Sequence, residues 1–225
     1  MPEPQQPPVV LIHGLATSAR RTWIETGWVD LLGDIGRQVH VIDLPGHGGT
    51  PLLADDEWDD LESWVLERLP EGPVDAIGFS MGAKVLLGLA GRAPDRFGKL
   101  VVAGVGGNLF RHDGHDALAS GMEGDEAGAE DPIVQHFLQL AESSGTEPVA
   151  IVSLIRRRSP SLEDLLPHLT AEVLVVIGDK DFALPAEPLM ERLPPSARLV
   201  VLRGVDHFAT PKAMGFLDAG LDFLA

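Results

Sequence analysis

The sequence predicts an α/β protein with a mostly parallel sheet of about six strands flanked by helices. Two observations carry this prediction. Short apolar runs alternate with segments of helical spacing, and 225 residues suit a single domain of this class, here residues 1–225. The expected strands lie near 9–13, 38–43, 74–78, 99–103, 173–177 and 198–202, and the expected helices near 22–35, 57–69, 81–93, 186–193 and 211–224.

The first expected strand is the apolar run 9–12, which opens into His13-Gly14-Leu15. Glycine there permits the backbone to turn across the carboxyl end of the sheet, where ligands of parallel α/β sheets bind. A histidine before a glycine at a strand end more often fixes the loop through a hydrogen bond than acts as a base. We therefore expect a structural role for His13.

The third strand and the helix after it enclose the most informative motif, Gly78-Phe79-Ser80-Met81-Gly82. The run 74–78 has the length of a buried strand. Residues 83–93 are mainly helix formers, and Pro94 is expected to end the helix. A Gly-x-Ser-x-Gly turn between a strand and a helix holds its serine in a strained conformation with the hydroxyl exposed. Ser80 is the predicted nucleophile.

A serine hydroxyl needs a general base and a group that orients the base. In folds with this elbow the acid and then the histidine follow the serine. Of eight histidines, only His207 lies in the last fifth of the chain, after strand 198–202, and we predict that it is the base.

The acid is Asp179 or Asp181, both just after the apolar strand 173–177. We favour Asp181, because a carboxylate needs a few residues beyond the strand end to turn back toward the imidazole. Asp179, next to Gly178, is better placed to shape or cap the turn.

An oxyanion hole completes the expected site. One donor is the backbone N–H of the residue after the nucleophile, Met81, and the other comes from the loop after an earlier strand. Leu15, in the loop after the first strand, is the expected second donor.

One segment interrupts the alternation of strands and helices, since about seventy residues separate the strands near 99–103 and 173–177. We interpret 105–171 as an insertion. Helical spacing covers 132–143 and 148–157, and Ser161 resembles the start of a capping box before a further short helix. The Gly- and acid-rich stretch 121–131 is expected to be mobile.

The chain resembles the α/β-hydrolase family. The motifs fall in the family's order over nearly the whole chain: His13-Gly14, Trp23, Asp43-Leu44-Pro45-Gly46-His47-Gly48, the elbow at Ser80, Gly178-x-x-Asp181 and His207. The resemblance implies a Ser80–His207–Asp181 triad and a small helical lid formed by 105–171, in which substrate identity is mainly decided.

Two features depart from the family pattern. Only eight residues precede the first strand, too few for the antiparallel hairpin that usually opens the sheet of this family. The residue before His207 is Asp206 where the family often has glycine. The first departure shortens the sheet, and the second changes the charge near the base while leaving the chemistry intact.

The formal net charge of −17, from 17 basic and 34 acidic residues, repels nucleic acid and anionic membrane surfaces. The expected partner is a small-molecule substrate, and the sequence does not determine the oligomeric state. Arg156-Arg157-Arg158 is the one basic run. Its expected place is a solvated helix end, with contact to an anionic substrate at the lid as the alternative.

Neither a cofactor nor a metal is expected. The chain has no cysteine, hence no thiolate metal site. His112 and His115 lack partner ligands nearby, and Gly104-Val105-Gly106-Gly107 lacks the spacing of a dinucleotide loop. Residues 1–8 lack the features of a secretory signal, and no apolar run approaches the ~18 residues of a membrane span, so a cytoplasmic protein is expected.

The leading functional hypothesis is hydrolysis of an ester or similar acyl bond of a small, fairly apolar substrate through an acyl-enzyme. A second hypothesis keeps the triad but uses the serine as a base in a lyase step, as in the branch of the family that serves menaquinone biosynthesis. Its anionic substrates would need arginines such as Arg20, Arg21 or the 156–158 run. A third is a non-catalytic binding protein, against which the intact triad argues.

Overall fold

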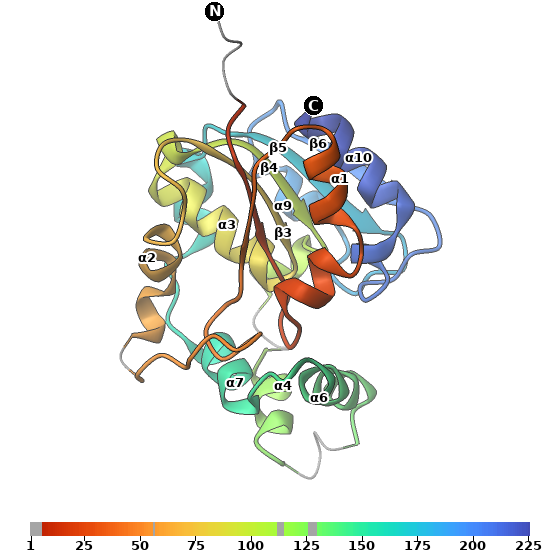
Figure 1. Cartoon of the computed structure of the whole chain (residues 1–225). Helices are drawn as coiled ribbons and strands as arrows, with labels where there is room; N and C mark the ends of the chain where they lie inside the picture. The colour runs from red at the N-terminus through yellow and green to blue at the C-terminus, as the bar shows by residue number, and fades with distance from the viewer. Residues whose placement is uncertain (1–5, 56, 112–114, 126–129) are drawn as a thin grey trace, which may run out of the picture.

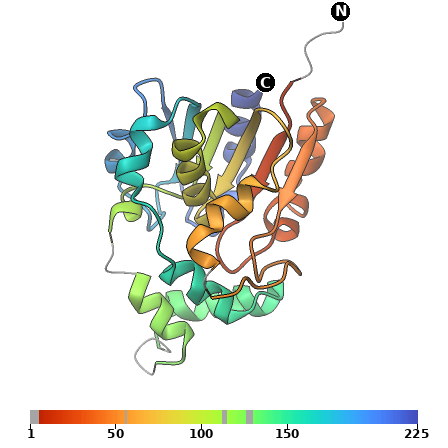
Figure 2. The ribbon, with the colours of Figure 1, turned by 90° about the vertical axis from the view of Figure 1, so that its left-hand side faces the viewer.

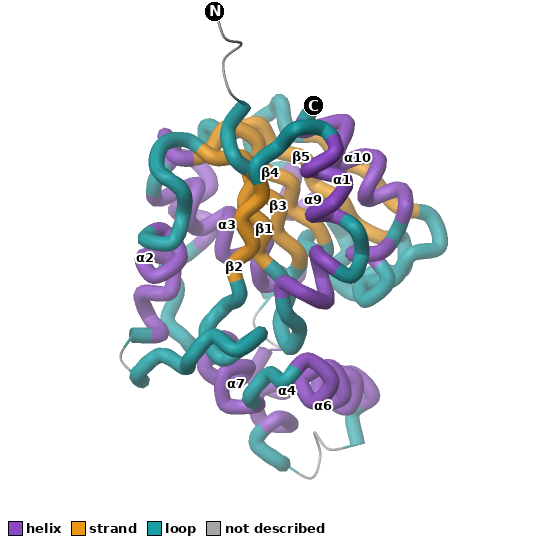
Figure 3. Tube along the Cα trace, viewed as in Figure 1, coloured by secondary structure: helices purple, strands orange, loops and turns teal. Residues whose placement is uncertain are grey.

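The computed structural model describes residues 6–55, 57–111, 115–125 and 130–225. Its six strands form one parallel sheet in the order β2-β1-β3-β4-β5-β6 (Figures 1 and 3). The strands are β1 (Val9–Ile12), β2 (Val39–Ile42), β3 (Val74–Phe79), β4 (Phe97–Ala103), β5 (Glu172–Gly178) and β6 (Arg198–Leu202). The predicted fold class is confirmed. Among the described residues the sheet has no antiparallel strand.

Helices cover both faces of the sheet, with α2 (Leu61–Leu66) and α3 (Met81–Arg92) on one and α1 (Trp28–Asp34) and α10 (Met214–Leu224) on the other (Figure 1). Each face carries its own apolar core. Val10 packs in the core under α3, whereas Val9 and Leu11 pack in the core with Trp28. This alternation follows from the period of two of a strand and explains the continuous apolar runs, since both faces are buried.

The helix at 81–93 agrees with the prediction to within one residue, but several others are shorter or interrupted. The expected helix 22–35 is divided into a short π-helical turn, Arg20–Ile24, and α1, because Gly27 between them adopts φ 87°. The expected helix 57–69 begins as a 3₁₀ turn, Trp58–Asp60. The expected helix 186–193 is only α9 (Glu187–Met190), and 211–224 starts with the 3₁₀ turn Thr210–Lys212 before α10.

The segment 105–171 contains α4 (His115–Met122), α6 (Pro132–Ser144), α7 (Pro148–Arg156) and α8 (Leu162–Leu165). In both views α4, α6 and α7 lie beyond the carboxyl ends of the strands, the end opposite the two chain termini (Figures 1 and 2). In contrast, α8 lies against α3, since a Cβ atom on Gly91 would be 2.5 Å from the carbonyl oxygen of Leu165. Three helices therefore stand over the end of the sheet where ligands are expected.

Some predictions fall outside the described residues. These are the N-terminal tail up to residue 5, His112 of the histidine pair, and residues 126–129 of the stretch expected to be mobile. At the start of α8, the hydroxyl of Ser161 accepts a hydrogen bond from the N–H of Glu163 at 3.2 Å, so Ser161 caps this helix. None of the helices in the described ranges has the length and hydropathy that crossing a bilayer requires.

Candidate active site

Ser80 occupies the sharp turn between β3 and α3, with φ 53° and ψ −111°. This backbone conformation is rare for a residue with a side chain. The flanking glycines permit the turn: a Cβ atom on Gly78 would lie 2.7 Å from the backbone of Ala83, and one on Gly82 would collide with the carbonyl oxygen of Ile12. The turn therefore has the strained, closely packed geometry of a nucleophile elbow.

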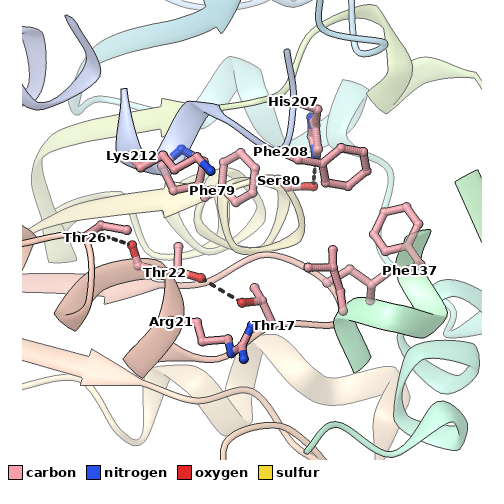
Figure 4. A pocket seen from close by; sticks show the side chains of 13 residues that line it. Thr17, Arg21, Thr22, Thr26, Phe79, Ser80, Phe137, His207, Phe208 and Lys212 are labelled. Atoms are coloured by element: carbon pink, nitrogen blue, oxygen red, sulfur yellow. Dashed lines mark hydrogen bonds between the residues drawn. The ribbon is translucent and has the colours of Figure 1, made fainter. Parts of the chain in front are cut away.

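The structure brings Ser80, His207 and Asp181 together in one hydrogen-bonded chain, although β3, β5 and β6 position them from distant parts of the sequence. The Nε2 atom of His207 lies 3.0 Å from the Oγ atom of Ser80 (Figure 4). The Nδ1 atom lies 2.9 and 3.1 Å from the two carboxylate oxygens of Asp181. With the proton on Nδ1 donated to Asp181, Nε2 is an acceptor for the serine hydroxyl.

The imidazole of His207 is buried between two aromatic rings, Phe79 at 4.9 Å and Phe182 at 4.1 Å between ring centroids. These contacts restrict rotation of the ring. Asp206, where the family often has glycine, accepts a hydrogen bond from the N–H of Ala209 at 2.9 Å and so orders the turn that carries the histidine.

The two aspartates after β5 have different surroundings. Asp181 is buried and also accepts a hydrogen bond from the N–H of Ala183 at 2.8 Å. Asp179 is exposed and accepts a hydrogen bond from the N–H of Gly204 at 2.7 Å, which links two turns. Asp181 therefore lies at His207, and Asp179 makes a turn-forming contact.

Leu15 and Met81 border the same cavity as Ser80. Within the part of the chain that the structure describes, the backbone N–H of neither residue donates a hydrogen bond. Two free donors beside the predicted nucleophile would be able to stabilise a developing oxyanion.

Two buried histidines hold the loop that carries Leu15. The Nε2 atom of His13 accepts a hydrogen bond from the N–H of Leu44 at 3.0 Å, and the Nε2 atom of His47 accepts one from the N–H of Ala16 at 3.3 Å. Each Nδ1 atom lies within hydrogen-bond distance of a carbonyl oxygen of its own loop. His13 thus has the structural contacts expected of it. His47 has the same role, which was not predicted from the sequence. Its position within the motif 43–48 was the sequence feature that could have indicated this role.

Burial lowers the pKa of His13 to about 4, and burial together with repulsion from His13, once that ring is protonated at low pH, lowers the pKa of His47 to about 3. Both rings accept hydrogen bonds from backbone N–H groups through Nε2, so protonation would break these contacts. Both imidazoles are therefore neutral in the folded protein near pH 7.

We expect the free energy of unfolding to fall as the pH is lowered from about 6.5 to about 4. In this range the histidines of the unfolded chain bind protons, whereas His13 and His47 in the folded chain do not, so protons favour unfolding. One pKa unit corresponds to about 1.4 kcal/mol, so His13 alone contributes about 3 kcal/mol over this range. Urea unfolding at a series of pH values measures how steeply the free energy of unfolding depends on pH.

The control is His47→Gln, which keeps an acceptor for the N–H of Ala16 but cannot be protonated. Its free energy of unfolding should depend less steeply on pH than that of the wild type between pH 6.5 and 4. Identical slopes for the two proteins would show that His47 makes no contribution to this dependence.

Two cavities meet at Ser80. The smaller, about 230 Å³, is lined by three threonines and two cations together with Ser80 and His207 (Figure 4). The larger, about 490 Å³, is mainly apolar and reaches α3, α4, α6 and α7. Leu15, Ser80 and Phe137 border both. The smaller one is also lined by Thr17, Arg21, Thr22, Thr26, Phe79, Leu140, His207, Phe208, Pro211 and Lys212, and the larger by Met81, Lys84, Val105, Asn108, Leu109, Arg111, Leu118, Ile133, Ile155 and Phe182.

The basic run at the end of α7, residues 156–158, is not a solvated helix end throughout. The guanidinium of Arg157 is buried and forms a two-pronged ion pair with the carboxylate of Glu62, at 2.7 and 2.8 Å. The prediction is wrong for this residue, because an acidic partner distant in sequence compensates the loss of hydration. Arg156 pairs with Glu123 at the surface, and neither cavity is lined by residues 156–158.

The described residues contain no group of three or more histidine, aspartate or glutamate side chains arranged to hold a metal ion.

The lyase hypothesis would need arginines that bind an anionic substrate. Of those it names, Arg21 borders the smaller cavity, whereas Arg20 pairs with Glu25 at 3.0 Å.

Comparison with known proteins gives a consistent result. The profile of the alpha/beta hydrolase family matches residues 9–219. A pimeloyl-(acyl-carrier protein) methyl ester esterase of Methylococcus capsulatus is 42% identical over 96 residues, which are 43% of this chain and 36% of the esterase. An (E)-2-((N-methylformamido)methylene)succinate hydrolase of Acinetobacter baylyi is 35% identical over 101 residues, 42% of this chain and 36% of that enzyme.

These matches therefore span only about a third of the length of the curated relatives. Among solved structures, the enol-lactonase of Burkholderia xenovorans superposes with a TM-score of 0.72 at 21% identity, over 100% of this chain and 93% of the lactonase. At this identity the structural likeness concerns the fold alone.

Proposed function

The chain belongs to the alpha/beta hydrolase family, and we propose that it is a serine hydrolase that cleaves an ester or similar acyl bond of a small, fairly apolar substrate. The observation that carries this proposal is the hydrogen-bonded chain Ser80–His207–Asp181 at the junction of two cavities. Two of the relatives are named as an esterase and a hydrolase, which supports the same reaction class.

The proposed reaction has two halves. In the first, the Oγ atom of Ser80 attacks the ester carbonyl while Nε2 of His207 takes the hydroxyl proton, and Asp181 stabilises the imidazolium. The N–H groups of Leu15 and Met81 donate to the oxyanion. The alcohol then leaves with the proton from His207. In the second half, water attacks the acyl-enzyme with His207 as the base, and the acid is released.

The two cavities suit the two parts of an ester. A leaving alcohol must lie close enough to Nε2 of His207 to take its proton, and His207 borders the smaller cavity. Both proposed oxyanion donors, Leu15 and Met81, border the larger cavity. We therefore assign the alcohol to the smaller cavity and the acyl chain to the larger one.

The segment 105–171 serves as the lid in this proposal. Its helices supply apolar side chains to the acyl cavity, among them Leu118, Ile133, Phe137 and Ile155, while the triad and the oxyanion donors lie outside it. The lid should therefore control which acyl groups bind without taking part in the chemical step.

Replacing Phe137 by alanine tests this division of roles. Phe137 borders both cavities, and loss of its contact with about two methylene groups of an acyl chain would raise KM about tenfold for a hexanoyl ester. We expect kcat for methyl acetate to change less than about threefold, because no contact with the reacting atoms is lost. Steady-state kinetics on the two esters provide the measurement.

The matched control is Leu138→Ala in the same helix, because Leu138 is partly buried against the core but borders neither cavity. This variant should leave KM for both esters near the wild-type value. A Phe137→Ala protein that is folded but no longer reacts with a fluorophosphonate would contradict the separation of lid and chemistry.

The function itself is tested with a fluorophosphonate probe, mass mapping of the adduct and a panel of methyl and nitrophenyl esters of graded acyl length. We expect a single adduct on Ser80 and release of alcohol from the short esters. A folded protein that forms no adduct and hydrolyses no ester in the panel would refute the proposal and favour a binding protein.

A further inference from the structure

Lys84 lies one helical turn after Ser80 on α3, about 6 Å along the helix axis. The two residues share a helix face, and both border the acyl cavity together with Met81. Lys84 is the one lysine among the described residues that line this cavity. In the described part of the chain, its ammonium forms neither an ion pair nor a hydrogen bond.

The nearest acidic group does not neutralise Lys84. Glu62 acts on it electrostatically, but both of its carboxylate oxygens are already bonded to Arg157, at 2.7 and 2.8 Å. Burial lowers the pKa of Lys84, the charge of Arg157 lowers it further, and Glu62 opposes these effects. The cluster of Glu62, Arg157 and Lys84 thus carries one positive charge without a counter-ion beside a partly desolvated cavity.

The rest of the acyl cavity does not supply the missing negative charge. None of its lining residues is acidic, in a chain whose formal net charge is −17. Arg111, a second cation of this wall, is exposed and donates to the carbonyl oxygens of Phe182 and Leu184 at 3.3 and 3.4 Å. An anion in this cavity would meet no like charge from the wall and would restore the balance at Lys84.

We propose that the acyl cavity accepts a chain that ends in a carboxylate, which pairs with the ammonium of Lys84. The substrate class is then the monoester of a dicarboxylic acid, and hydrolysis gives the dicarboxylate and an alcohol. Leu109, Leu118 and Ile155 contact the methylene groups between the two ends. This inference rests on the proposed esterase function and specifies its substrate class.

The test compares pairs of methyl esters that differ only in the terminal carboxylate. Monomethyl esters of dicarboxylic acids from succinate to sebacate are measured against methyl esters of monocarboxylic acids with the same number of chain carbons. We expect wild-type kcat/KM to favour the anionic ester by at least tenfold at one chain length. Lys84→Met should lower kcat/KM for that ester 10- to 100-fold, the usual range for a lost charged hydrogen bond, and change the neutral ester little.

Lys99→Met is the matched control, because Lys99 lies at the opposite end of the sheet and donates to the carbonyl oxygen of Ala225. It should retain the wild-type preference. The proposal is wrong if no chain length shows a preference for the anionic ester. It is also wrong if Lys212→Met, in the smaller cavity, removes the preference and Lys84→Met does not.

A binding measurement separates this inference from the proposed function. In a Ser80→Ala background, calorimetric titration with each monomethyl ester of the series should show, for at least one chain length, at least tenfold weaker binding when Lys84 is also replaced by methionine. If the wild type hydrolyses no ester but this difference in binding persists, the esterase proposal fails and the carboxylate site stands. Equal binding with and without the ammonium, in folded proteins, refutes the carboxylate site.

Discussion

Ser80→Ala should lower kcat for every ester that the wild type hydrolyses by roughly 10⁵-fold or more, because the group that we propose forms the acyl-enzyme is gone. The fold should be retained. Among the described residues the hydroxyl is hydrogen-bonded only to Nε2 of His207, and alanine adopts the backbone conformation at φ 53° with a strain similar to that of serine. Initial rates measure kcat, circular dichroism measures whether the fold is retained, and fluorophosphonate labelling measures the loss of the reactive serine.

Ser196→Ala is a suitable control, since Ser196 is exposed in the loop before β6, at the end of the parallel sheet opposite Ser80, Asp181 and His207. It should be labelled and should turn over esters like the wild type. Some hydrolysis above the uncatalysed rate will survive in Ser80→Ala if the oxyanion donors and the cavities still bind the ester. Wild-type turnover by Ser80→Ala would refute the assignment of the nucleophile.

Asp181→Asn should slow turnover by roughly 10⁴-fold, by analogy with other triads. The asparagine amide donates a hydrogen bond to Nδ1 of His207, so the imidazole proton moves to Nε2. Nε2 then faces Ser80 as a donor and cannot accept the hydroxyl proton. The side-chain oxygen of asparagine can still accept from the N–H of Ala183, so the loop should keep its conformation. The loss should appear in kcat for short and long esters alike.

Asp179→Asn, the same substitution two residues earlier in the sequence, is the control for Asp181→Asn. Its side-chain oxygen still accepts from the N–H of Gly204, and it has no contact with His207, so turnover should stay within about threefold of the wild type. If Asp179→Asn proved to be the slower of the two, Asp179 would be the catalytic acid and the assignment of Asp181 would be wrong.

The sequence predicted the parallel sheet and its strands because both faces of each central strand are buried, which leaves an uninterrupted apolar run. It also placed the elbow at Ser80, since the glycines at 78 and 82 are demanded by close backbone approach at that turn. Helix lengths were less predictable. Gly27, in a left-handed conformation, divides a segment whose apolar spacing resembles one helix.

Contacts between remote segments lay beyond the sequence. Glu62, in α2, and Arg157, just after α7, are separated by 95 positions, and each resembles an ordinary surface charge in its local sequence. Only the packing of α2 against the end of α7 buries them as a pair. The same packing leaves Lys84 without a counter-ion, so the residue that we propose to select the substrate carries no signal in its local sequence.

By itself, the sequence determined the order of strands and helices, the serine elbow and the candidate acid and base, because these depend on residues close together in the chain and on the order in which they occur. The tertiary structure decided that Asp181 and not Asp179 contacts His207, that His13 and His47 hold the Leu15 loop, and that two cavities meet at Ser80. These features depend on distances between segments far apart in sequence. Such distances are set by the packing of the helices on the sheet, which no local pattern records.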